Sequence, residues 1–272
     1  MNLNVVFQES DTLKVMTFNI RLDVASDGEN AWQYRKEIAA GVFNKFNIDI
    51  AGIQEALFNQ IEDLNKLLPE YGWYGAGRND GKRDGEFSAI FYRKDKLKLV
   101  KGNTFWLSEK PDEPGSVGWD AALTRICTWG EFKDLITGKT FFFFNTHFDH
   151  IGEKARENSA DLIVFEINKI ARGNPVILTG DFNFNDSSLS YKKLINNKLI
   201  NLKDVRSIAG VKTSGPEWSF HGFNTVQENK REKIDFIFVN DCVKAFSHSI
   251  LDYSENGRYP SDHLPVTAEL EY

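Results

Sequence analysis

The 272 residues include only two cysteines, Cys127 and Cys242. Two thiols are too few for a disulfide framework or for a zinc site built from four thiolates. Both lie in apolar, strand-like segments, so we expect two buried, free thiols.

The sequence also lacks a run of about eighteen apolar residues, which a membrane-spanning helix would need. The segment from Met1 to Ser10 has neither the basic start nor the apolar core of a signal peptide. We therefore expect a soluble protein with no membrane span. A signal peptide that had already been removed would leave no trace, so cytoplasmic and periplasmic or secreted locations stay open.

Positive charge is not in surplus, since 33 Lys and Arg face 39 Asp and Glu, a net charge of −6. We therefore do not expect tight binding of duplex nucleic acid through net charge alone. Repeats, low-complexity tracts and a Pro, Gly or Ser linker are also missing from the sequence. Because 41% of the residues are hydrophobic, the chain can bury a sizeable core. We predict one domain over residues 13–272, preceded by an N-terminal extension, 1–12.

Apolar residues alternate with polar ones in many short segments, as in half-buried β-strands. The segment 141–144 consists of four phenylalanines, which indicates a sheet buried on both faces. The expected strands are 13–19, 48–53, 87–92, 124–132, 140–147, 176–179, 234–239 and 264–270.

Three segments carry apolar residues at helical spacing instead. They are 39–46, 57–68, which Pro69 ends, and 155–170, which the Gly-Asn-Pro at 173–175 follows. Residues 108–120 and 210–232 are expected to be long loops. Many strands with few helices favour an α/β fold of two packed sheets with outer helices.

Polar residues stand where five of the apolar segments end. An Asn or Asp after a strand is usually a turn former that bonds to the local backbone. Together, however, these residues supply carboxylates for a hard cation, amides and imidazoles for a phosphoryl group, and a carboxylate that can activate water. The positions are Asn19, Glu55, Asn145 to His147, Gly180 to Asn183 and Ser261 to His263.

The order of these motifs resembles that of the endonuclease/exonuclease/phosphatase superfamily, also called the DNase I-like family. The resemblance covers nearly the whole chain, and the segments 85–93 and 123–129 are similar to its deadenylase and nocturnin-type branch. It implies a four-layered α/β/β/α sandwich in which two mixed sheets pack face to face with outer helices. The matching motifs are 17–19, 53–55, 145–147, 180–183, 233–237 and 261–266.

The resemblance also implies a role for each motif residue. Glu55 would hold a divalent cation, Mg²⁺ with Mn²⁺ as a substitute, helped by Asn19 and Asp262. Asp181 would orient or deprotonate the attacking water, beside Asn183. His263 and His147 would contact phosphoryl oxygens. Asp235 would fix the tautomer of His263 through the other ring nitrogen.

Three further residues are candidate phosphate contacts. Arg125 is a lone cation in an uncharged segment and could bind a phosphate with two donors or form a structural ion pair. His150 follows the third motif in Phe148-Asp149-His150, where an aliphatic residue is more familiar, and could shape specificity. His221 lies in an aromatic loop that either stacks on a base or sugar or packs on itself.

Two other hydrolase types fit the sequence less well. The segment 145–150 differs only at Asn145 from the H-x-H-x-D-H pattern of metallo-β-lactamase-like enzymes, but the later histidines are not placed to complete a dinuclear zinc site. Ser261, Asp262 and His263 cannot form a catalytic triad, because neighbours on an extended chain point to opposite faces.

The expected protein is thus a Mg²⁺-dependent phosphoesterase that hydrolyses a phosphodiester or phosphomonoester by attack of an activated water. A 3′ to 5′ RNA exonuclease of deadenylase type is one alternative, and a catalytically silent binding module is another. The complete set of motif residues favours an enzyme. The partner would be a small phosphate ester or the end of a single-stranded nucleic acid, and no protein partner is predicted.

Overall fold

The computed structural model describes residues 12–272, so most of the expected N-terminal extension lies outside the described residues. The four α-helices are α1 (Lys36–Lys45), α2 (Phe58–Leu67), α3 (Glu153–Ala171) and α4 (Leu189–Ile195). The strands are β1 (Leu13–Asn19), β2 (Ile50–Ala56), β3 (Tyr71–Tyr74), β4 (Phe87–Arg93), β5 (Leu97–Trp106), β6 (Ile126–Asp134), β7 (Thr140–His147), β8 (Val176–Asp181), β9 (Lys203–Asp204), β10 (Lys212–Ser214), β11 (Asp235–Val239), β12 (Lys244–Ile250) and β13 (Val266–Glu271). Short 3₁₀ turns occupy Ala25–Asn30, Trp32–Tyr34, Val205–Ser207 and Glu228–Lys230.

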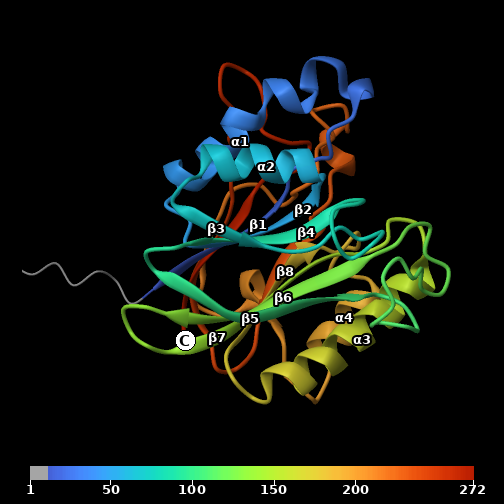
Figure 1. Cartoon of the computed structure of the whole chain (residues 1–272), viewed down its shortest axis with the longest axis vertical. Helices are drawn as coiled ribbons and strands as arrows, with labels where there is room; N and C mark the ends of the chain where they lie inside the picture. Colours follow the sequence, from blue (N-terminus) through green and yellow to red (C-terminus); the bar gives the residue numbers. More distant parts are fainter. Residues whose placement is uncertain (1–11) are drawn as a thin grey trace, which may run out of the picture.

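The strands form two sheets that face each other (Figure 1). One has seven strands in the order β10-β12-β13-β1-β2-β4-β3, and the other has six in the order β5-β6-β7-β8-β11-β9. Both sheets are mixed, because β1 pairs parallel with β2 and antiparallel with β13, and β7 pairs parallel with β8 and antiparallel with β6. In Figure 1, α1 and α2 cover the outer face of the first sheet, and α3 and α4 cover that of the second. The predicted four-layered α/β/β/α sandwich is confirmed.

Strand β7 shows why each sheet is buried on both faces. Successive side chains of a strand point to opposite sides. Phe141 and Phe143 accordingly belong to the apolar cluster between the two sheets, whereas Phe142 and Phe144 belong to the cluster under α3 and α4. A third cluster fills the space between the first sheet and α1 and α2. Three apolar layers thus separate the four layers of secondary structure.

A polar contact joins the sheets inside this apolar interior. Asn145 of β7 donates from its Nδ2 to the carbonyl oxygens of Ile53 and Ala89 in the other sheet, at 2.9 and 3.0 Å. Its Oδ1 accepts from Gln54 at 2.6 Å. Gly52 lies so close that a Cβ atom there would be 2.3 Å from Asn145 Oδ1. This contact holds the strand ends of both sheets together beside the predicted site.

The structure differs from the sequence predictions in several places. All eight expected strands and three expected helices are present, but β3, β5, β9, β12 and α4 were not expected. The two long loops contain only short elements, β10 and the 3₁₀ turn Glu228–Lys230. Cys127 is buried as expected, whereas the prediction for Cys242 was wrong: it is exposed, in the turn between β11 and β12. No helix among residues 12–272 is long and apolar enough to cross a membrane.

Candidate active site

Two rows of polar residues meet at one edge of the sandwich. In the six-stranded sheet, strand register sets His147 beside Asp181 and Asp181 beside Asp235. In the seven-stranded sheet, Asn19 ends β1 and Glu55 lies near the end of the adjacent β2. The rows border a cavity of about 290 Å³. Its lining consists of Arg21, Leu22, Glu55, Glu86, Leu123, Arg125, His147, His150, Asp181, Asn183, Phe220, Ile234, Asp262 and His263.

Glu55 reaches the cavity because β2 is irregular at this point. The pairing of β2 with β4 shifts between Ile53 and Ala56, and Glu55 has a left-handed φ of 66°. A β-bulge of this kind re-aims a side chain, and such strained backbone is found preferentially at functional sites. The expected strand stopped before Glu55, whereas the observed strand continues to Ala56 around the bulge.

Asn19 connects the two rows. Its Nδ2 donates to Glu55 Oε1 and to Asp181 Oδ2, both at 2.9 Å. Its Oδ1 accepts from the backbone N–H of Arg21 at 2.9 Å. In this arrangement the amide nitrogen faces the carboxylates, so the predicted role of Asn19 as a metal ligand requires the amide to turn over.

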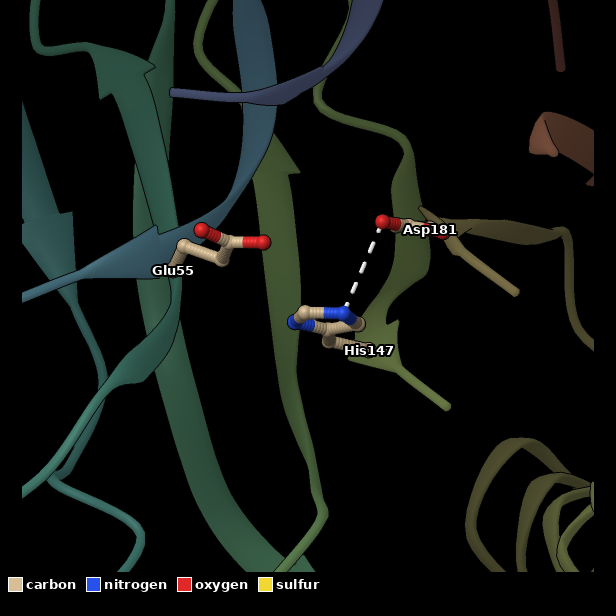
Figure 2. A group of neighbouring side chains, drawn as sticks. All are labelled: Glu55, His147 and Asp181. Atoms are coloured by element: carbon tan, nitrogen blue, oxygen red, sulfur yellow. Dashed lines mark ion pairs between the residues drawn. The ribbon is translucent and has the colours of Figure 1, made fainter. Parts of the chain in front are cut away.

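The carboxylates fit a divalent cation. One ligand atom each from Glu55, His147 and Asp181 lie within 4.8 Å of one another (Figure 2). Burial raises the pKa of Asp262, and the charge of nearby Glu55 raises it further while His263 opposes the shift. Crowded, buried carboxylates of this kind are relieved by a bound cation. Carboxylate oxygens are the ligands that Mg²⁺ prefers.

Asp181 and His263 lie together at the β8 and β11 side of the cavity. Burial, together with the charge of Asp235, raises the pKa of Asp181 to about 7. Burial opposes a charge on His263, but the carboxylates of Asp235 and Asp181 outweigh it and raise its pKa to about 10. His263 Nδ1 lies 2.8 Å from Asp235 Oδ2, and its Nε2 lies 3.7 Å from Asp181 Oδ2. His263 therefore donates its Nδ1 proton to Asp235, and its Nε2 proton is available to a group bound in the cavity.

His147 is held neutral. Burial lowers its pKa well below 6.5, and the charges of Arg125 and Arg78 add to the effect. Asn183 Nδ2 donates to Phe148 O at 2.9 Å and lies 3.1 Å from His147 Nε2. Because Nδ2 is a donor, Nε2 accepts and the ring proton is on Nδ1. That atom lies 3.9 Å from Glu86.

Arg125 is held by Asp149 and His150, the two residues that made the third motif unfamiliar. Its Nε donates to Asp149 Oδ2 at 3.3 Å, and its Nη2 lies 2.9 Å from His150 Nδ1. Asp149 also accepts from the backbone N–H groups of Leu123, Ile151 and Gly152. Burial opposes ionisation of Asp149, but backbone N–H groups, those of Gly152 and Ile151 among them, and the charge of Arg125 hold its pKa below its usual range. Arg125 Nη1 is buried without a hydrogen-bond partner, and the residue lines the cavity.

His221 does not reach the cavity. Its ring is fully buried, with centroids 4.5 Å from Tyr259 and 5.9 Å from Trp218. Its Nδ1 accepts from the backbone N–H of Asn224, and burial lowers its pKa to about 4. The His221 ring thus packs on Trp218 of its own loop and on Tyr259, whereas Phe220 of the same loop lines the cavity 4.9 Å from the His263 ring. Nothing in the placement of His221 supports a phosphate contact.

Sequence reasoning missed four residues around the site. Glu86 lines the cavity and pairs with Arg78 at 2.6 Å. Arg21 lies at the mouth, held by Asp27. Two buried residues support the site from behind: Ser219 donates to Asp235 Oδ2 at 2.6 Å, and Arg35 donates to the carbonyl oxygens of Ile20, Arg21, Asn30 and Pro260. Glu86 stands at the start of an expected strand, and attention to strand starts as well as ends would have found it.

A four-layered sandwich with carboxylates and imidazoles at one edge of its paired sheets defines a hydrolase of the DNase I-like fold. The sequence profile of the endonuclease/exonuclease/phosphatase family matches residues 16–263, and the chain belongs to this family. Family members are hydrolases that act on phosphate esters, and this protein is such an enzyme. The expected alternative of a catalytically silent binding module is set aside.

Solved structures of family members have the same fold as this chain. A Bacteroides vulgatus member of the family is 44% identical, with a TM-score of 0.92, and the match covers 96% of this chain and 98% of that one. The mannosyl-6-phosphatase of Bacteroides thetaiotaomicron is 39% identical, with a TM-score of 0.88 and coverage of 96% and 100%. The human nocturnin catalytic domain is 20% identical, with a TM-score of 0.75 and coverage of 96% and 93%. The likeness to nocturnin concerns the fold alone.

Proposed function

We propose that the protein is a Mg²⁺-dependent phosphomonoesterase that removes phosphate from a small phosphorylated sugar. The observation that carries this proposal is the cavity of about 290 Å³, which Glu55, His147, Asp181, Asn183, Asp262 and His263 line together. Small-molecule sites measure roughly 300–1,000 Å³, so a cavity of this size suits a single small ester better than a polymer. The mannosyl-6-phosphatase of Bacteroides thetaiotaomicron, 39% identical over nearly the full length of both chains, supports the sugar.

A bound cation would supply positive charge to the phosphoryl oxygens and lower the pKa of a coordinated water. Glu55 and Asp262 would hold this cation, and Asn19 lies between Glu55 and Asp181. The chain has no surplus of positive charge, since its net charge is −6. This agrees with a small anionic substrate that a few local cations recognise.

Asp181 takes a proton from the attacking water. With a pKa of about 7, its carboxylate is basic enough to accept this proton and is half ionised at neutral pH. His263 is protonated at that pH, because its pKa is about 10, and donates from Nε2 to a phosphoryl oxygen as negative charge develops. Asp235 keeps its ring oriented through Nδ1.

The other phosphoryl oxygens would contact donors at the edge of the six-stranded sheet. His147 offers its Nδ1 proton without carrying a charge, and Asn183 lies beside it. Arg125 Nη1 is buried without a partner, and an anion that accepted from it would satisfy this donor. A phosphomonoester dianion offers more charge and one more terminal oxygen than a diester, which favours the monoester.

Hydrolysis of a substrate panel tests this function. The panel contains mannose 6-phosphate, p-nitrophenyl phosphate, bis-p-nitrophenyl phosphate and oligo(A), each with Mg²⁺ and with EDTA. We expect metal-dependent release of phosphate from the two monoesters, and Glu55→Gln and Asp181→Asn to lower kcat by about 10²-fold or more. Metal-dependent shortening of oligo(A) from its 3′ end, without monoester turnover, would instead assign the ribonuclease.

A further inference from the structure

The β6 side of the cavity is separated from the residues that act on water. In the six-stranded sheet β6, β7, β8 and β11 are consecutive, so Arg125 before β6, His147 at the end of β7 and Asp181 at the end of β8 follow one another along the edge. Neighbouring strands lie about 4.8 Å apart. Arg125 therefore stands about two strand spacings, roughly 10 Å, from Asp181.

This separation sets the orientation of a bound ester in the cavity. In phosphoryl transfer to water the attacking and leaving oxygens lie on opposite sides of phosphorus. Asp181 and His263 place the attacking water at the β8 and β11 side. The leaving oxygen, and the alcohol attached to it, then point toward the β6 side.

Three cavity-lining residues stand at that side: Leu123, Arg125 and His150. His150 lies one contact beyond Arg125, since its Nδ1 is 2.9 Å from Arg125 Nη2. A guanidinium only donates, so Nδ1 accepts and the proton of a neutral His150 is on Nε2. No residue in the described range 12–272 accepts from that atom. His150 is exposed and lines the cavity, so its Nε2 is available as a donor at the β6 side.

Asp149 holds Arg125, the partner of His150 Nδ1, and both of its carboxylate oxygens already accept hydrogen bonds. Its Oδ1 accepts from Ile151 and Gly152, and its Oδ2 from Leu123 and Arg125. The loop after β7 is thereby bonded to the segment before β6. The side chain of Leu123, 40% exposed, adds an apolar surface beside the two donors.

We propose that Leu123 and His150 form a subsite for the leaving alcohol, in which His150 Nε2 donates to a hydroxyl or ring oxygen of a sugar. An apolar surface beside a fixed donor matches the C–H face and the oxygens of a polyhydroxylated ring. The inference rests on the proposed function and names the part of it that selects the substrate. His150 acts on specificity and takes no part in the chemical step, whereas Asp149 is a positioning residue.

Two substitutions separate the two nitrogens of His150. His150→Asn places an oxygen near the Nδ1 position and can still accept from Arg125, but it loses the outward donor. His150→Gln places an amide near the Nε2 position and can still donate outward. Ile151→Ala is the matched control, because Ile151 is 66% exposed in the same loop and does not line the cavity.

The measurement is kcat/KM for mannose 6-phosphate and for p-nitrophenyl phosphate, whose leaving group has no sugar hydroxyls. We expect His150→Asn to lower kcat/KM for the sugar phosphate by about tenfold, the effect of one lost hydrogen bond. The loss on p-nitrophenyl phosphate should be smaller than that on the sugar phosphate. His150→Gln should keep the ratio of kcat/KM for the two esters near the wild-type ratio, and Ile151→Ala should resemble the wild type on both esters. Equal losses on both esters, or no loss on either, would overturn the inference.

Failure of the proposed function gives a different result. If the wild type hydrolyses no monoester, calorimetric titration of the EDTA-treated protein with mannose 6-phosphate decides the inference without turnover. We expect His150→Asn to bind about tenfold more weakly than His150→Gln. Equal affinity in the two variants, or no binding by the wild type, would exclude a sugar subsite at His150.

Discussion

At position 263, two opposed effects set the charge of one imidazole. Burial disfavours the charged ring, and the carboxylates of Asp235 and Asp181 outweigh burial, so the pKa rises to about 10. The ring is therefore protonated throughout the neutral range and loses its proton only in alkali. The activity that depends on this proton should fall at high pH.

Asp235→Asn tests this account. The change removes the carboxylate 2.8 Å from His263 Nδ1 while keeping its shape, so the pKa of His263 should fall. We expect the alkaline limb of the pH profile of kcat/KM to move to lower pH by about one unit or more, at saturating Mg²⁺. Asp241→Asn, at an exposed position after β11, should leave the profile unchanged. An alkaline limb that stays in place would show that His263 does not set it.

Asp181 makes a prediction about stability. Its pKa is about 7 in the folded chain against an ordinary value of 3.8, so ionisation between those values favours the unfolded state. The cost appears as the pH rises above about 4 and is complete above about 7. Asp181→Asn should therefore increase the free energy of unfolding at pH 8 by about 1–2 kcal/mol in EDTA. The gain should nearly vanish at pH 4.

Urea unfolding at the two pH values measures the difference. Asp161→Asn, at an exposed position on α3, controls for loss of a surface carboxylate. A loss of stability at pH 8 in Asp181→Asn would mean that attraction to His263 and Asn19 exceeds the cost of burying this charge.

For single residues, the sequence predicted which residues belong to the candidate site better than it predicted what their side chains pack against. Asn19, Glu55, Asp181 and His263 could be found because a polar side chain at the end of an apolar strand is conspicuous. Whether His221 would face the cavity could not be predicted, because a loop's course depends on tertiary packing. Here Tyr259, from a distant part of the chain, covers it.

At the scale of single elements, strands with strong alternation were predicted and weakly patterned ones were not. Strand β5 carries exposed lysines and pairs with β6 at the edge of its sheet. Its apolar and polar residues therefore alternate less regularly than those of the inner strands. β3 and α4 are short, with 4 and 7 residues. Such elements owe their structure to the neighbours on which they pack rather than to local preference. The bulge at Glu55 was likewise not predictable from the residues of β2.

The two sheets approach each other closely at Gly52 in β2. A Cβ atom there would be 2.3 Å from Asn145 Oδ1 and from Thr179 Oγ1. Gly52→Ala should therefore push β2 away from β7 and β8, break the bonds of Asn145 and lower the free energy of unfolding by about 2–3 kcal/mol. Denaturant unfolding measures this loss.

Gly41→Ala is the matched control. Gly41 lies inside α1, and the nearest atom to a Cβ there is 3.8 Å away. Alanine stabilises a helix interior relative to glycine by up to about 1 kcal/mol. The control should thus be neutral or stabilising. If Gly52→Ala is equally harmless, the sheets do not need this contact to stay in register.

At the scale of the whole molecule, the active site belongs to neither sheet alone. Glu55 and Asn19 come from the seven-stranded sheet, and His147, Asp181 and Asp235 come from the six-stranded sheet. The chain leaves the first sheet after β4 and returns to it with β10 and then with β12 and β13. The segment between β12 and β13 carries Asp262 and His263 to the cavity. Folding of both sheets and their correct packing are therefore conditions for the chemistry.

A metal ion bound between the sheets should accordingly stabilise the entire sandwich. A ligand that binds only the folded chain adds about 2.7 kcal/mol at one hundred times its Kd, which corresponds to about 5–10 °C in Tm for a protein of this size. We expect Mg²⁺ to raise the Tm of the EDTA-treated wild type by an amount that grows with its concentration. Glu55→Gln should abolish the rise, whereas Glu62→Gln, at an exposed position on α2, should preserve it. Scanning calorimetry over a Mg²⁺ series checks this, and an equal rise in Glu55→Gln would place the bound ion elsewhere on the molecule.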